Sequence, residues 1–60
     1  MSRQTVLVVA PNWLGDAVMA LPAIADVRRA MPDARLIVAA RGGVADLCAM
    51  VPGVDAVLAL

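Results

Sequence analysis

The stretch Val6–Ile24 constrains the fold of this 60-residue chain more than any other segment. It begins with a β-branched, apolar run that stops at Pro11, continues through a short polar loop, and ends in a second apolar run with helical spacing. This order predicts a strand, a tight turn and a helix. In an α/β sheet such a turn lies at the carboxyl end of the strand, where these folds place their ligands. Asp16 is the only charged residue between Arg3 and Asp26, and a lone charge there is costly unless it is hydrogen-bonded, solvated or in use.

Apolar runs follow one another along the chain in a β-α-β-α-β order. Strands are predicted at Thr5–Ala10, Leu36–Ala40 and Val54–Leu60, and helices at about Gly15–Ala30 and Val44–Met50. The first strand lacks period-two alternation, which is typical of a strand buried on both faces of a parallel sheet. Strands joined by helices predict parallel pairing with right-handed crossovers, with the second strand beside the first and the third beyond it. We therefore expect an α/β fold, the first half of a Rossmann-like parallel-sheet domain.

The first predicted helix has one apolar face, formed by residues at i, i+3, i+4 and i+7 spacings: Leu14, Ala17, Val18, Leu21, Ile24 and Ala25. Asp26 and Arg29 lie off this face, three residues apart, and are placed to pair weakly. The sequence Arg28-Arg29 is typical of a solvated helix end with a favourable dipole interaction. Pro22 predicts a kink or a division of the helix.

Composition argues against several classes of function. Five Arg balance five Asp, and zero net charge with scattered arginines argues against a basic patch that would bind nucleic acid. Cys48 is the only cysteine, which predicts a buried structural thiol rather than a disulfide or a metal cluster. Pro11, Gly15, Asp16 and Pro22 interrupt the apolar stretch, which argues against a membrane span and against a signal peptide.

The length predicts a part of a larger protein. Sixty residues are about half of a typical domain, and so short a chain has marginal stability because it buries little surface. The sequence also ends inside the apolar run Val57–Leu60. We expect residues 1–60 to be the N-terminal part of a Rossmann-like domain, with the remainder of that domain and a further domain outside this chain.

The first loop reads PNWLGD and has neither of the common glycine-rich nucleotide-binding patterns. It lacks GxGxxG, which argues against classical NAD binding, and it lacks GxxxxGK[ST], which excludes a P-loop. Gly42-Gly43, after the second strand, is a weaker signal. It is consistent with an exit turn that needs flexible residues.

The segment APNWLGDAVMALPAI resembles the N-terminal motif of the lipopolysaccharide heptosyltransferases, especially the heptosyltransferase II type. Members begin with a Val/Leu/Ile-rich strand, followed by a short polar loop ending in Gly-Asp and a Met- and Leu-rich helix. Residues 32–40, 44–47 and 51–55 are also similar, so the resemblance covers essentially this whole chain but only the beginning of a family member. Heptosyltransferase I types carry a Lys and small hydroxyl residues where this chain has Ala10-Pro11-Asn12-Trp13, which favours the second type.

The resemblance implies a GT-B glycosyltransferase, with two Rossmann-like domains facing a cleft and this chain in the acceptor-side domain. The implied reaction is inverting transfer of heptose from ADP-heptose to the inner core of lipopolysaccharide, without a cofactor or metal. The family's loop Asp, a general base, maps onto Asp16. The implied location is cytoplasmic, with peripheral contact at the inner membrane surface and no nucleic-acid partner. Two alternatives stay open: a non-catalytic Rossmann-like half-domain that binds a nucleotide or a partner, and a fragment without a function of its own.

Each candidate site residue also has a structural interpretation. Asp16 is a candidate general base or an N-cap of the helix. Gly15 lets backbone approach a ligand, or permits a turn with positive φ. Asn12 and Trp13 are candidate substrate contacts, through a hydrogen bond and through stacking on a sugar, or they stabilise the loop and pack at the domain edge. Arg41 is a candidate contact for an anionic acceptor group or a solvated loop residue.

Overall fold

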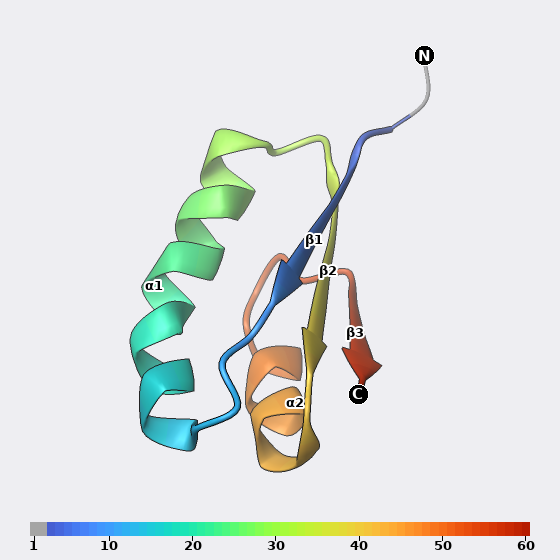
Figure 1. Cartoon of the computed structure of the whole chain (residues 1–60). Helices are drawn as coiled ribbons and strands as arrows, with labels where there is room; N and C mark the ends of the chain where they lie inside the picture. Colours follow the sequence, from blue (N-terminus) through green and yellow to red (C-terminus); the bar gives the residue numbers. More distant parts are fainter. Residues whose placement is uncertain (1–2) are drawn as a thin grey trace.

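The computed structural model describes residues 3–60, which form three strands and two helices. Their order is β1 (Thr5–Val9), α1 (Leu14–Ala30), β2 (Arg35–Ala40), α2 (Gly42–Ala49) and β3 (Ala56–Ala59). The strands form one all-parallel sheet in the order β1-β2-β3 (Figure 1). The chain therefore has the α/β arrangement of one half of a Rossmann-like domain, and the predicted fold class and strand order are confirmed.

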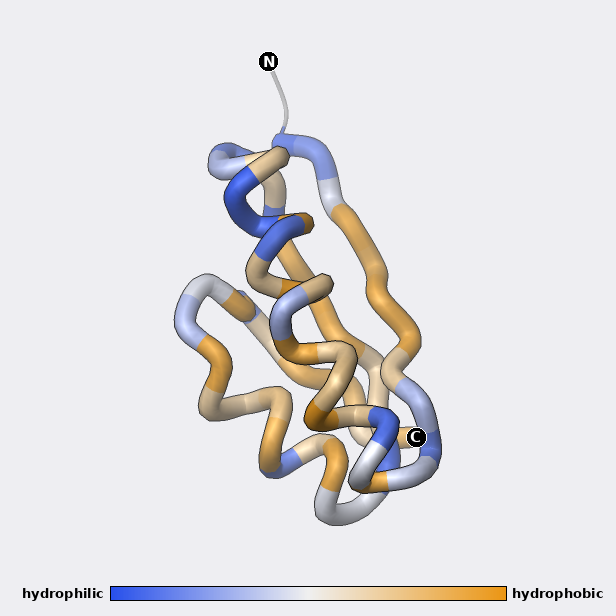
Figure 2. The backbone as a smooth tube through the Cα atoms, turned by 90° about the vertical axis from the view of Figure 1, so that its left-hand side faces the viewer, coloured by the Kyte–Doolittle hydropathy of each residue, from blue (hydrophilic) through white to orange (hydrophobic). Residues whose placement is uncertain are grey.

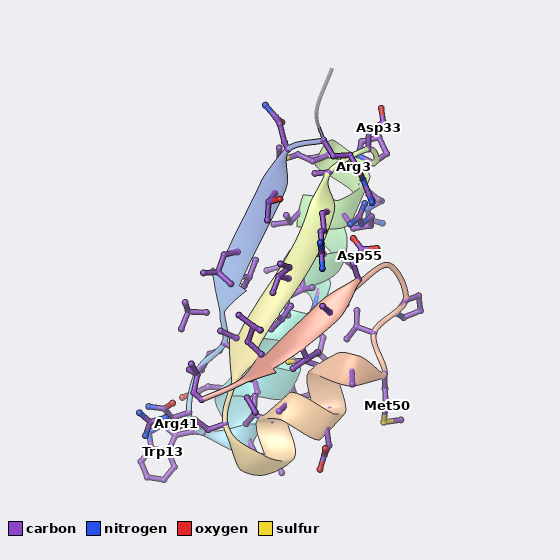
Figure 3. All side chains as sticks on the ribbon, turned by 90° about the vertical axis from the view of Figure 1, so that its right-hand side faces the viewer. Arg3, Trp13, Asp33, Arg41, Met50 and Asp55 are labelled. Carbon is purple, nitrogen blue, oxygen red and sulfur yellow. The ribbon has the colours of Figure 1, made fainter. Side chains whose placement is uncertain are left out.

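The sheet has one covered face and one open face within the described residues. Leu36 and Val38 of the central strand point toward the helices and are fully buried. Leu7, Val9 and Leu58 are more than half exposed, and the strand register places them on the opposite face. Both helices lie behind the sheet in the view of Figure 3. The prediction that the first strand is buried on both faces is therefore wrong for residues 3–60, because no described element covers the second face.

The core lies between the covered face and the two helices. Its buried members are Ala10, Ala17, Ile24, Leu36, Val38, Ala40, Val44 and Cys48. Figure 2 shows that the strands are hydrophobic along most of their length and that hydrophilic segments gather mainly toward the two ends of the molecule. Cys48 is buried, as predicted, and burial raises the pKa of its thiol. The thiol therefore stays protonated near neutral pH and is a poor nucleophile.

Helix α1 passes through Pro22 without interruption, so the predicted division of the helix is not present. Of the predicted apolar face, Ala17 and Ile24 are fully buried, whereas Leu14 and Val18 are more than half exposed. Leu14 and Val18 are four residues apart and share a side of α1 that no described element covers, whereas Ala17 of the first turn lies in the core (Figure 1).

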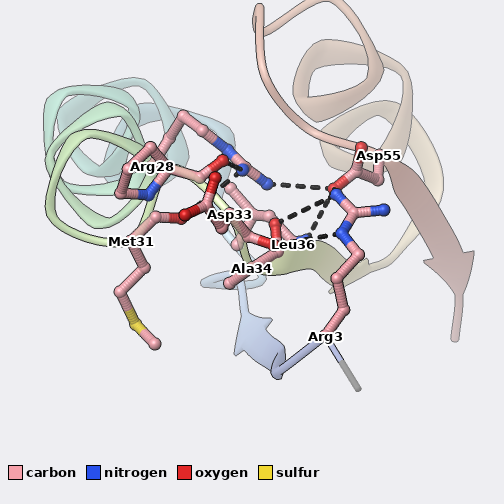
Figure 4. Close-up of polar contacts among 8 residues, drawn as sticks. Arg3, Arg28, Met31, Asp33, Ala34, Leu36 and Asp55 are labelled. Carbon is pink, nitrogen blue, oxygen red and sulfur yellow. Dashed lines mark hydrogen bonds and ion pairs between the residues drawn. The ribbon is translucent and has the colours of Figure 1, made fainter. Parts of the chain in front are cut away.

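A polar cluster at the amino end of the sheet joins α1, β2 and the start of β3 (Figure 4). One carboxylate oxygen of Asp55 accepts a hydrogen bond from the backbone N–H of Leu36 at 2.7 Å and one from the Arg28 guanidinium at 2.9 Å. The Arg3 guanidinium lies 3.7 Å from the same oxygen. We call these four residues the Asp55 cluster. Because it links segments far apart in the sequence, it fixes the end of α1 against the sheet.

The two arginines at the end of α1 differ in their surroundings. Arg29 is exposed and pairs with Asp26, as predicted. The side chain of Arg28 is only 19 % exposed and also donates a 3.0 Å hydrogen bond to the carbonyl oxygen of Pro32. The prediction of a solvated helix end is therefore wrong for Arg28, because the start of β3 brings Asp55 within its reach.

Asp55 is expected to make stability depend on pH in acid. The Leu36 N–H, followed by the charges of Arg28, Arg3 and Arg35, lowers the pKa of this carboxyl. A carboxyl with a depressed folded-state pKa stabilises the fold fully above its unfolded pKa, about 3.9. This contribution is lost as pH falls through the lower folded value. We expect the difference in free energy of unfolding between the wild type and Asp55→Asn to shrink steadily as pH falls below about 4.

The measurement is urea denaturation of both proteins from pH 5 down to pH 2. Asp46→Asn is the matched control, since Asp46 is exposed and forms no hydrogen bond or ion pair with other residues in the range 3–60. If the difference in free energy of unfolding between the wild type and Asp55→Asn stayed constant over this pH range, the cluster would not stabilise the fold.

Candidate functional site

The carboxyl ends of the strands and the N-termini of both helices lie at one end of the molecule, the lower end in Figure 1. β1 leads through Asn12 to Trp13, which is the N-cap of α1. β2 leads directly to Arg41, which is the N-cap of α2. Trp13 and Arg41 therefore lie at the same end, opposite the one that carries Arg3 and Asp33 (Figure 3). Ligands of open α/β sheets bind at this carboxyl edge.

Asp16 is the third residue of α1 and its side chain is exposed. It forms no hydrogen bond or ion pair with any other residue between 3 and 60. The interpretation of Asp16 as the N-cap is wrong, because Trp13 occupies that position and no side chain caps the helix. Its carboxylate is therefore free to contact a ligand at the N-terminal end of the helix.

Both helices begin with backbone N–H groups that have no partner among the described residues. The first bonded N–H in α1 is that of Ala17, which donates to the Trp13 carbonyl at 2.9 Å. In α2 the first are those of Val44 and Ala45, which donate to the Arg41 carbonyl at 3.0 and 3.2 Å. The preceding N–H groups of each helix are thus free. Together with the helix dipoles they favour negative charge at this edge.

The two glycine positions of the site behave differently. Gly15 is helical and does not have the positive φ that was expected as one alternative. A Cβ placed on Gly15 would meet nothing within 4 Å, so its backbone faces open space. Gly42 has φ +48, which a non-glycine residue rarely adopts. The predicted need for flexible residues after the second strand is confirmed at Gly42, although this residue begins α2 rather than ending a loop.

The structure brings the five predicted site residues to one edge. Asn12, Trp13, Gly15, Asp16 and Arg41 are all exposed there, and Trp13 is 75 % exposed. Their side chains make no hydrogen bonds to one another. The resulting surface offers a carboxylate as a proton acceptor, a guanidinium for an anion, an indole for a sugar face, and free N–H groups.

The free N–H groups were not identified as site features from the sequence. A signal for them exists, because neither Trp13 nor Arg41 is a capping residue such as Ser, Thr, Asp or Asn. A helix that starts after such a residue leaves its first N–H groups to solvent or to a ligand.

A separate apolar groove lies between α1 and α2. It has a volume of about 460 Å³ and is lined by Leu21, Pro22, Ala25, Leu47, Met50, Val51 and Pro52. None of the predicted site residues lines it. The chemistry-bearing residues are therefore gathered at the carboxyl edge and not in the groove.

Between residues 3 and 60, no helix is both long and apolar enough to cross a membrane, and no group of three His, Cys, Asp or Glu residues is placed to hold a metal ion. No protein-family model, curated protein or solved structure matches the chain.

Proposed function

We propose that this chain is the N-terminal part of the acceptor-side domain of an inverting GT-B glycosyltransferase, one that transfers heptose from ADP-heptose to the inner core of lipopolysaccharide. The observation that carries the proposal is the exposed carboxylate of Asp16, unpartnered within residues 3–60, in the first turn of α1 at the carboxyl edge of a parallel sheet. The resemblance of residues 10–24 to the heptosyltransferase motif selects this reaction among the many that such an edge supports.

The reaction assigns one proton transfer to Asp16. A hydroxyl of the acceptor attacks the anomeric carbon of the heptose, the bond from that carbon to the diphosphate oxygen breaks, and ADP leaves. The attacking hydroxyl must lose its proton as the bond forms, and a carboxylate within hydrogen-bond reach accepts it. Attack on the face opposite ADP inverts the anomeric configuration.

The other edge residues bind and orient the acceptor. Arg41 and the free N–H groups at the start of α2 suit a carboxylate or phosphate of the inner core. The exposed indole of Trp13 suits the face of a sugar ring, and the Asn12 amide suits its hydroxyl groups. The open space beside Gly15 allows the acceptor to approach the backbone. The nucleotide-sugar would be held mainly by the second domain, and the enzyme would act in the cytoplasm at the face of the inner membrane.

The test is an assay of the full-length protein with ADP-heptose and lipopolysaccharide from a strain that lacks core heptose. We expect ADP release that depends on the acceptor, together with an acceptor product heavier by one heptose. UDP-glucose is the control donor and should give no product. Binding of ADP without any transfer would contradict the proposal and favour a non-catalytic nucleotide-binding domain instead.

A further inference from the structure

The two halves of α1 are held to the rest of the molecule in different ways. We call Leu14–Leu21 the leading half and Ala23–Ala30 the anchored half. In the anchored half, Ile24 is 2 % exposed and lies in the core. Arg28 connects the same half to Asp55 at 2.9 Å and to the backbone after the helix. This half therefore has an apolar and a polar attachment.

The leading half has much weaker attachments. Its only fully buried side chain is the methyl group of Ala17. Met19 is 79 % exposed, and Leu14 and Val18 are more than half exposed. No side chain of this half forms a hydrogen bond or ion pair with another residue in the range 3–60. The Trp13 side chain does not cap it either.

Pro22 separates the two halves. A proline has no N–H, so it cannot donate to the Val18 carbonyl four residues earlier, and its ring crowds that carbonyl. The hydrogen bonding along α1 is thus weakest at the boundary between the anchored half and the leading half. Kinks in helices occur at such positions.

We infer that α1 is hinged at Pro22. The leading half moves relative to the sheet with Trp13, Gly15 and Asp16, while the anchored half stays fixed by Ile24 and the Asp55 cluster. Pro22 is therefore a positioning residue, since it acts on the carboxylate of Asp16 only through the helix. This inference does not depend on the proposed reaction, because any ligand at the carboxyl edge would meet the same movable segment.

The test is amide hydrogen exchange of the full-length protein, compared between Ala17–Leu21 and Val27–Ala30. In the wild type we expect the first group to exchange at least about tenfold faster than the second. Pro22→Ala restores the missing donor and should slow exchange at Ala17–Leu21 by about tenfold or more, while leaving Val27–Ala30 unchanged.

Two further variants separate a hinge from ordinary fraying. Pro52→Ala is the matched control, because Pro52 lines the same groove outside α1, and it should leave both groups unchanged. Arg28→Met should speed exchange in the anchored half, since it removes the bond to Asp55. Equal protection of the two groups in the wild type would overturn the inference. The inference would also be overturned if residues Ala17–Leu21 exchanged at the same rate in Pro22→Ala as in the wild type, because a helix end that merely frays does not respond to residue 22.

Discussion

If the proposed transferase activity holds, replacing Asp16 by Asn is expected to lower the kcat of the full-length protein by roughly 10²–10⁴-fold, the usual contribution of a positioned general base. Asn keeps the size of the side chain and most of its hydrogen bonding but cannot accept the proton of the attacking hydroxyl. The side chain of Asp16 is exposed and has no partner within residues 3–60, so the substitution breaks no contact in that range. The KM for the acceptor and the melting temperature should therefore change little.

Kinetics and melting curves distinguish this role from a structural one. An acidic residue in the first turn of a helix contributes typically about 0.3–1 kcal/mol through the helix dipole. If that were its whole role, Asp16→Asn would lower stability slightly and leave turnover intact. Asp46→Asn, the matched control on α2, should behave as the wild type in both measurements. Near wild-type kcat in Asp16→Asn would remove Asp16 from the proposed mechanism.

The strands and their order could be predicted because they depend on local pattern and on general connection rules. The apolar runs before Pro11 and after Arg35 are short, β-branched and bounded by turn residues, so the sequence predicts the bounds of both strands to within a residue or two. The sequence predicts that the last strand starts at Val54, two residues before its start at Ala56, because Val54 and Asp55 form the connection that brings the Asp55 carboxylate to Leu36.

Features that depend on distant residues could not be predicted from local sequence. Arg28 and Asp55 are 27 residues apart, and only the parallel register brings them together. The continuity of α1 through Pro22 could not be predicted from local sequence either, since packing of Ile24 overrides the local preference for a break. The composition of the candidate site was predictable because a single turn, PNWLGD, carries most of it. The capping geometry was not, because the sequence leaves Asp16 open as the N-cap, whereas the helix begins at Leu14 and Trp13 is the N-cap.

Replacing Gly53 by Ala is expected to destabilise the fold by roughly 1–3 kcal/mol, the cost of one residue held in a disfavoured backbone region. Gly53 has φ +90, which an L side chain rarely adopts. Its Cβ would also lie 2.8 Å from Cγ of Arg28, closer than real Cβ contacts occur. Arg28 cannot simply move away, because its guanidinium is bonded to Asp55 and to the Pro32 carbonyl. The clash with Arg28 therefore adds to the backbone strain at residue 53.

Thermal denaturation of Gly53→Ala beside Gly43→Ala isolates this effect. Gly43 lies in α2 without a positive φ, and a Cβ there meets nothing within 4 Å. Alanine is the better helix former by about 1 kcal/mol, so Gly43→Ala should keep or raise the melting temperature. For a domain of this size, each kcal/mol shifts the midpoint by about 4–8 °C, so the two variants should differ clearly. Equal midpoints would mean that the turn at Gly53 adapts without strain and that Arg28 does not hold its position against β3.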